Sequence, residues 1–142
     1  MKIDTESKMK FDDSIETEDR FAIRKWFQKF IDFQNNNDVE ALQVILSPEC
    51  VFDGWTRRAM DPETYCAYQE RRAISDTVFT VRYPELQFRK RGQIFRVSGS
   101  FEEYHDGGLI MEGMVDIKIE LRNKVFQLVK HKFIPRLIIR TE

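Results

Sequence analysis

Residues 30–54 read FIDFQNNNDVEALQVILSPECVFDG, and this stretch decides the fold. Its first residues are the last residues of a helix, which ends at the Asn-rich segment of residues 35–37. Asp38 then caps a short second helix, which Pro48 stops. A short strand over residues 50–53 follows, and Gly54 breaks it. The stretch therefore predicts the order helix, short helix, short strand.

A long amphipathic helix precedes this stretch. Its apolar residues recur with the period of a helix, at Ile23, Trp26, Phe27, Phe30 and Ile31. The sequence Thr-Glu-Asp at residues 17–19 supplies a cap and negative charge at its start. Residues 1–13 are polar and carry mixed charge, so we expect a loose N-terminal arm there.

One further helix and then a series of strands are expected in the rest of the chain. Asp61 and Pro62 predict the start of a third helix, because Asp caps it and Pro needs no amide partner at the first position. From residue 76 onward the apolar residues alternate with a period of two, and a one-residue slip at Pro84 predicts a β-bulge. The turn sequences between the strands are Arg91-Gly92, Asp106-Gly107-Gly108 and Arg122-Asn123-Lys124.

The apolar faces of these elements define the expected core. Four long strands follow the third helix, and the last of them is expected to run from Val125 to about Ile139, with a break at Pro135. We expect these residues to be buried: Phe27, Phe30, Val81, Val97, Phe101, Val115, Ile117 and Ile119.

The composition excludes several classes of protein. The 142 residues carry a net charge of −1, so nothing favours nucleic acid or an anionic membrane as a partner. The N-terminus has no apolar segment of a secretory signal, and we expect a cytoplasmic protein. Cys50 and Cys66 are expected to be free, buried thiols. No spacing of metal ligands is present, and no cofactor is expected.

The stretch Phe30–Gly54, followed by a third helix and long strands, resembles the start of nuclear transport factor 2-like proteins, which include the SnoaL-like polyketide cyclases and ketosteroid isomerase. The resemblance implies an α+β fold in which three N-terminal helices pack on a strongly curved, mainly antiparallel sheet, shaped like a cone. It implies one SnoaL-like domain over residues 1–142, a pocket for a small apolar or aromatic ligand, and a homodimer formed through the outer face of the sheet.

Asp53 is the first candidate catalytic residue, because its place after Val51-Phe52 is similar to that of the general base in ketosteroid isomerase. A carboxylate in an apolar pocket has a raised pKa, which suits proton abstraction. The alternative is that Asp53 caps the turn before Gly54. The positions that match the two oxyanion donors of that enzyme hold Phe30 and Ile117, which cannot donate, so steroid isomerase chemistry is not expected.

His131 and Asp116 form the second candidate pair. If the last hairpin turns at Asn123-Lys124, the two residues lie directly opposite one another, and an Asp beside a His is a common arrangement for proton transfer. The alternative is a polar cross-strand pair on the surface, and a shift of one residue in the turn would separate the two side chains.

Two hypotheses about function remain open on the sequence. The first is a small-molecule-binding protein, with an isomerase, lyase or hydrolase activity that uses Asp53 as base. The second is a non-catalytic, dimeric binding or accessory subunit. The expected ligand pocket consists of Phe30, Trp55, Tyr65, Tyr104 and Ile117.

Overall fold

The computed structural model describes residues 3–139, which form three helices and seven strands. The helices are α1 (Thr17–Asn35), α2 (Val39–Ile45) and α3 (Pro62–Ala73). The strands are β1 (Lys8–Phe11), β2 (Leu46–Asp53), β3 (Phe79–Arg82), β4 (Glu85–Arg91), β5 (Ile94–His105), β6 (Gly108–Arg122) and β7 (Val125–Ile138).

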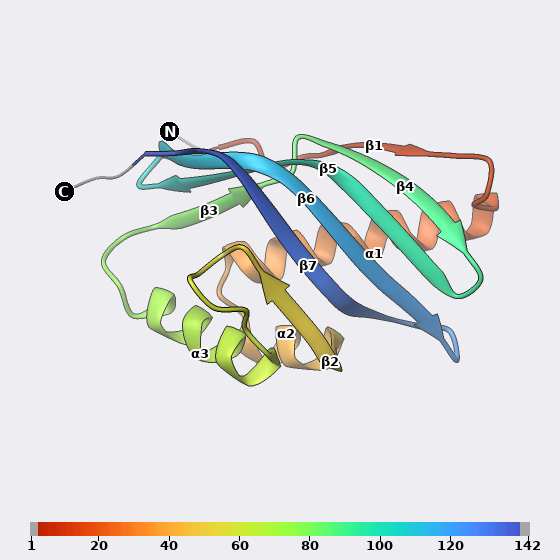
Figure 1. The fold of residues 1–142 in the computed structure, drawn as a ribbon, viewed down its shortest axis with the longest axis horizontal. Helices are drawn as coiled ribbons and strands as arrows, with labels where there is room; N and C mark the ends of the chain where they lie inside the picture. Colours follow the sequence, from red (N-terminus) through yellow and green to blue (C-terminus); the bar gives the residue numbers. More distant parts are fainter. Residues whose placement is uncertain (1–2, 140–142) are drawn as a thin grey trace.

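The seven strands form one curled sheet, and the helices lie on one side of it (Figure 1). The strand order is β1-β4-β5-β6-β7-β2, and β3 pairs with the far end of β5. The predicted α+β class is confirmed. The sheet is mixed, since four strand pairs are antiparallel whereas β1/β4 and β2/β7 are parallel, and it is not closed into a barrel.

The helix starts follow the local sequence. The carboxylate of Asp38 accepts a hydrogen bond from the amide of Ala41 at the start of α2. The carboxylate of Asp61 does the same for the amide of Thr64 at the start of α3, where Pro62 takes the first position. These two predicted caps are confirmed, whereas the cap expected from residues 17–19 is absent: Glu16 is the N-cap residue of α1, and its side chain makes no cap hydrogen bond.

Two strand boundaries differ from the prediction. Residues 8–11, expected to lie in a loose arm, form β1 and pair in parallel with residues 85–88. The backbone of this edge segment gains ladder hydrogen bonds, and the ring of Phe11 stacks on Phe88 at 4.8 Å between centroids, which explains the order. The strand β2 begins at Leu46, four residues before the predicted start at Cys50.

The predicted slip at Pro84 is present as a bend between β3 and β4. Arg82 pairs with Glu102 and Leu86 pairs with Gly99 along the same neighbour, β5. The chain advances four residues from Arg82 to Leu86, whereas β5 advances only three between Glu102 and Gly99. The extra residue between β3 and β4 forms a β-bulge, which bends the sheet.

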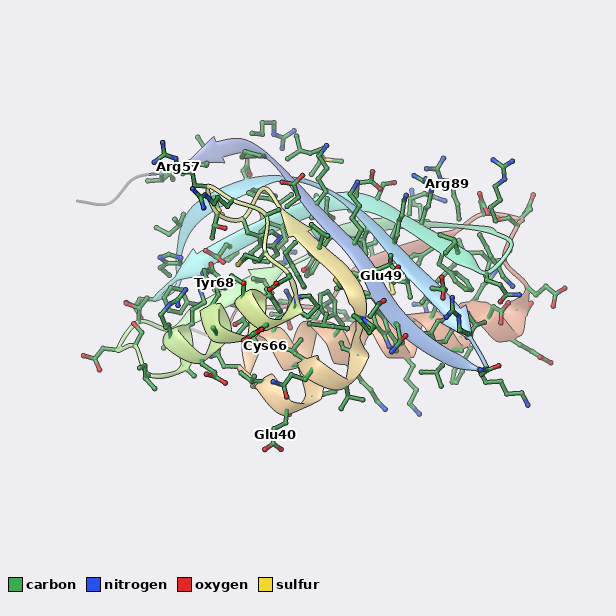
Figure 2. All side chains as sticks on the ribbon, turned by 60° about the horizontal axis from the view of Figure 1, so that its bottom comes forward. Glu40, Glu49, Arg57, Cys66, Tyr68 and Arg89 are labelled. Atoms are coloured by element: carbon green, nitrogen blue, oxygen red, sulfur yellow. The ribbon has the colours of Figure 1, made fainter. Side chains whose placement is uncertain are left out.

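The interior between helices and sheet is filled by side chains, many of them aromatic (Figure 2). All eight residues expected in the core are buried, and so are Cys50 and Cys66, whose thiols are free. Within residues 3–139, no helix combines the length and the apolar character needed to cross a membrane.

Candidate functional site

One extra residue in β7 determines which side chains enter the interior. The hairpin turns at Asn123-Lys124 as predicted, with φ of 52° and 64°, and Ile119 faces Leu128. The next pair is Lys118 with Lys130, so the residue between Leu128 and Lys130 has no partner and forms a β-bulge.

The bulge separates the predicted pair of Asp116 and His131. His131 faces Ile117, and Asp116 faces Lys132. A shift of one residue reverses the face of every following side chain. The predicted pairing is therefore wrong: His131 belongs to the buried face, where it is 0% exposed, while Asp116 remains half-buried on the opposite face.

Both ring nitrogens of His131 have hydrogen-bond partners. The indole Nε1 of Trp55 donates to Nδ1 at 2.9 Å, and the hydroxyl of Tyr83 lies 2.9 Å from Nε2. An indole N–H can only donate, so Nδ1 carries no proton and the neutral ring has its proton on Nε2. Nε2 then donates to the Tyr83 oxygen, and the Tyr83 hydroxyl donates to Oε1 of Gln34 at 2.9 Å.

Burial keeps this histidine neutral. It lowers the pKa of His131 from its ordinary value of 6.5 to about 3. Burial also raises the pKa of Tyr83 well above its ordinary value. At neutral pH the two side chains therefore act as uncharged hydrogen-bonding groups.

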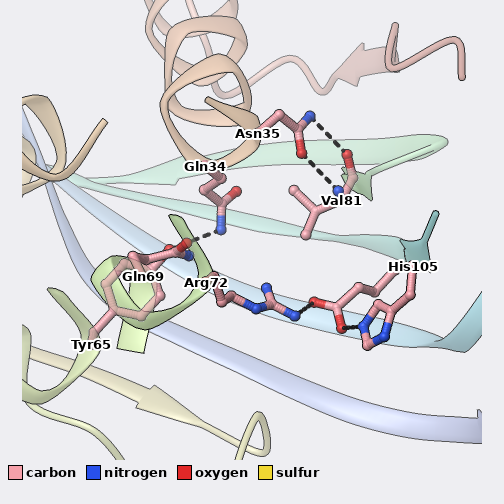
Figure 3. A network of polar contacts seen from close by, with 8 residues as sticks. Gln34, Asn35, Tyr65, Gln69, Arg72, Val81 and His105 are labelled. Atoms are coloured by element: carbon pink, nitrogen blue, oxygen red, sulfur yellow. Dashed lines mark hydrogen bonds and ion pairs between the residues drawn. The ribbon is translucent and has the colours of Figure 1, made fainter. Parts of the chain in front are cut away.

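The chain of hydrogen bonds continues to α3 (Figure 3). Nε2 of Gln34 donates to the hydroxyl of Tyr65 at 3.2 Å, and Nε2 of Gln69 donates to the same hydroxyl at 2.9 Å. Among the described residues, Oε1 of Gln69 is buried without a partner. We call these six residues the His131 network: Gln34, Trp55, Tyr65, Gln69, Tyr83 and His131.

Gln34 and Gln69 were missed by the sequence analysis. Gln34 lies three residues after Ile31 on the apolar face of α1 and is 4% exposed. A polar residue in phase with an apolar helix face is the signal that would have found it.

Aromatic rings enclose the His131 network. Phe52 stacks on Tyr65 with 3.6 Å between ring centroids and on His131 with 5.4 Å. Phe30 and Phe101 approach the imidazole at 6.1 and 6.2 Å. Among the residues predicted to line a pocket, Phe30, Trp55, Tyr65 and Ile117 are all buried here.

Trp55 reaches the interior from the loop of residues 53–59. Two hydrogen bonds between the backbones of Phe52 and Met60 close the base of this loop, at 2.8 and 2.9 Å. Gly54, with φ of 88°, turns the chain so that Trp55 points inward. Trp55 is the one buried residue of the loop, and Figure 2 shows Arg57 pointing outward from it.

Asp53 does not belong to the network. It follows the inward-pointing Phe52 and therefore lies on the other face of β2, where it is half-buried and in register with Lys132. Within residues 3–139 its carboxylate has no hydrogen bond or ion pair. Tyr104 is also separate, since its hydroxyl donates to Glu102 at 3.0 Å.

A second polar cluster lies beside the network (Figure 3). Nη2 of Arg72 lies 2.6 Å from Oε1 of the fully buried Glu103, and Nε2 of His105 lies 2.9 Å from Oε2. The guanidinium carbon of Arg72 stands over the ring of Phe79 at 4.1 Å. This buried ion pair connects α3 to β5.

The fold of this chain is similar to the folds of several solved structures. An NTF2-like protein from Cytophaga hutchinsonii matches with a TM-score of 0.69 and 18% identity, over 83% of this chain and 97% of that chain. A candidate scytalone dehydratase from Novosphingobium aromaticivorans matches with a TM-score of 0.72 and 9% identity, over 83% and 84%.

The chain has the nuclear transport factor 2-like fold.

The chain also matches Bd1075 of Bdellovibrio bacteriovorus, with a TM-score of 0.71 and 10% identity, over 84% of this chain but only 41% of that chain. It thus spans less than half the length of that protein. No protein-family model and no curated protein matches the sequence. At such identities the likeness concerns the fold, and the function must be argued from the interior of the NTF2-like cone.

Proposed function

We propose that this protein binds a small, largely apolar molecule inside the cone, with neutral His131 as its polar anchor. The observation that carries the proposal is a fully buried histidine with both ring nitrogens in hydrogen bonds, surrounded by aromatic rings. Ligand sites combine apolar walls with a few placed polar groups, and the His131 network has this composition.

Binding is better supported than turnover. An isomerase, lyase or hydrolase needs a base inside the cone, and Asp53 lies on the other face of β2. His131, with a pKa of about 3, does not take up a proton at neutral pH. We therefore give the central role to His131 in place of Asp53 and propose no reaction.

The fold comparison supports a small-molecule ligand. One solved protein of this fold is described as a candidate scytalone dehydratase, a name that refers to a small-molecule substrate. Oε1 of Gln69, which has no partner within residues 3–139, adds a second polar group that a ligand or a water molecule can satisfy.

The test is a calorimetric titration of the purified protein with 2-naphthol. We expect saturable binding by the wild type and its loss in His131→Phe, which keeps an aromatic side chain but removes both nitrogens. The matched control is Phe95→Leu, since Phe95 is equally buried and packs on Phe126 away from Trp55. Equal binding by wild type and His131→Phe would contradict the proposal.

The outer face of the sheet favours a second candidate function, that of a dimeric accessory subunit. Met114 on β6 and Ile134 on β7 form a cross-strand pair and are 43% and 48% exposed. Leu137 on the same face is also exposed. Beside Met114 lies a hollow of about 430 Å³. Exposed apolar groups on adjacent strands are typical of contact surfaces, and we propose that two copies associate here.

A further inference from the structure

We propose that the outer face of the sheet carries a docking site for an acidic α-helix of a partner protein. The inference concerns the face opposite to the helices, so it does not depend on the interior ligand proposed above. It starts from a row of positively charged side chains that crosses the strands of the sheet.

The strand register places four cations side by side. Arg89 on β4 faces Arg96 on β5. Arg96 in turn faces Lys118 on β6, which faces Lys130 on β7. We call these four residues the cation row.

The members of the cation row point away from the helices. Arg96 and Lys118 each lie between two buried residues of their strands, so both project from the outer face. Lys130 precedes the inward-facing His131, and Figure 2 shows Arg89 on the side of the sheet away from the helices. The row is therefore open to a partner.

The charge of the cation row is not neutralised within the described chain. Among residues 3–139, none of its members forms an ion pair. Like charges that face one another across strands repel, and a negatively charged partner removes this repulsion. A second copy is a poor source of the missing charge. The neighbouring acids Glu102 and Glu112 on this face are already paired with Arg82 and Arg136.

The surroundings of the row indicate a narrow partner that is a protein. Acidic residues lie on both sides of Lys118 along β6, namely Glu120 and Asp116. A broad negative surface such as an anionic membrane would meet these carboxylates and be repelled. The row contains no aromatic side chain on which bases could stack, and the chain has a net charge of −1, so a nucleic acid is disfavoured.

The spacing of the row favours a helix. Neighbouring strands lie about 4.8 Å apart, whereas side chains repeat about every 5.4 Å along one face of a helix and about every 6.7 Å along an extended segment. Over four positions the mismatch is roughly 2 Å for the helix and roughly 6 Å for the extended segment. The flexible stems of Lys and Arg can accommodate the smaller mismatch. The partner is therefore a helix with Asp or Glu at positions i, i+4, i+7 and i+11, lying across β4 to β7.

The experiment measures the binding of two fluorescently labelled, alanine-rich peptides by anisotropy. One peptide carries four Glu at i, i+4, i+7 and i+11, and the other has the same composition with the four Glu spread around the helix. We expect the wild type to prefer the first peptide at least about fivefold, and Arg96→Glu combined with Lys118→Glu to weaken its binding at least about tenfold. The matched control is Lys25→Glu with Lys29→Glu, which makes the same change of charge at exposed positions of α1 and is expected to bind like the wild type.

The outcomes test the row and the kind of partner separately. Failure of the first peptide to bind, equal affinity for the two peptides, or an equal loss of binding in the two double variants would overturn the inference. Tighter binding of a single-stranded DNA oligonucleotide, with the same dependence on Arg96 and Lys118, would also overturn it and assign the row to nucleic acid. Circular dichroism checks that the variants are folded, and Arg96→Gln with Lys118→Gln takes the place of the charge reversal if that variant does not fold.

Discussion

At the scale of single residues, His131 makes the stability of the protein depend on pH. Its imidazole is neutral in the folded state because burial removes the water that would solvate the charge. In the unfolded chain the same side chain is solvated and can take up a proton near its ordinary pKa of 6.5.

We predict that the free energy of unfolding decreases as the pH falls below about 6.5. Between this value and a pH of about 3 the unfolded chain binds a proton that the folded chain does not, so acid favours unfolding. The slope is at most about 1.4 kcal/mol per pH unit from this group. The contribution of neutral His131 to the free energy of unfolding is therefore fully present above about pH 6.5. It is lost progressively as the pH falls toward about 3.

Urea unfolding of wild type and His131→Phe at pH 7, 6 and 5 measures this contribution. The difference in slope between the two proteins isolates His131, because all other titrating groups are shared. Parallel stability curves over this range would show that the folded protein takes up a proton at His131 as readily as the unfolded chain does.

At the scale of elements, the contact between the 53–59 loop and β7 depends on a glycine. Gly54 has φ of 88°, and a Cβ atom added to it would lie 1.9 Å from the carbonyl oxygen of Phe133. Gly92, in the turn between β4 and β5, has φ of 62° but open space around the same position.

We predict that Gly54→Ala destabilises the protein far more than Gly92→Ala. The substitution at Gly92 adds only left-handed backbone strain, about 1 kcal/mol. The substitution at Gly54 adds the same strain and forces the loop away from β7, for a total of about 3 kcal/mol or more. Thermal and urea unfolding of both variants measure the difference, and equal losses would contradict a close approach at Gly54.

Elements with a strong period were predictable from sequence, and positions that depend on an irregularity were not. The apolar repeat in α1 and the alternation in β6 predicted their buried faces, as the burial of Phe27 and Ile117 confirms. The face of His131 depends on one unpaired residue in β7, and no local sequence signal marked this bulge. Trp55 was expected in the interior pocket, and its inward turn follows from the positive φ of Gly54.

At the scale of the whole molecule, the two faces of the sheet differ in the side chains that they carry. The inner face carries the His131 network, and the outer face carries exposed apolar side chains on β6 and β7. We therefore propose that the inner face binds the small molecule and that the outer face binds a second copy.

We predict that the protein is a homodimer and that Ile134→Lys converts it to a 17.0 kDa monomer. The charge would lie in the middle of the contact, where burying it without a partner is costly. The matched control is Val44→Lys on α2, at a position that is 75% exposed and away from the sheet. Light scattering of the three proteins measures the mass, and a wild type that stays monomeric at high concentration would rule out the dimer.

The hydrogen bonds of His131 also have a consequence for synthesis on the ribosome. They connect residues 76 and 48 positions apart, and β7 supplies the parallel partner for β2. While β7 is still inside the ribosome, β2 lacks its strand partner, and Phe52 and Trp55 lack the ring of His131 that packs on both of them. Such distant contacts make folding slow and favour a single late step. Until that step, the nascent chain is a target for chaperones and vulnerable to aggregation.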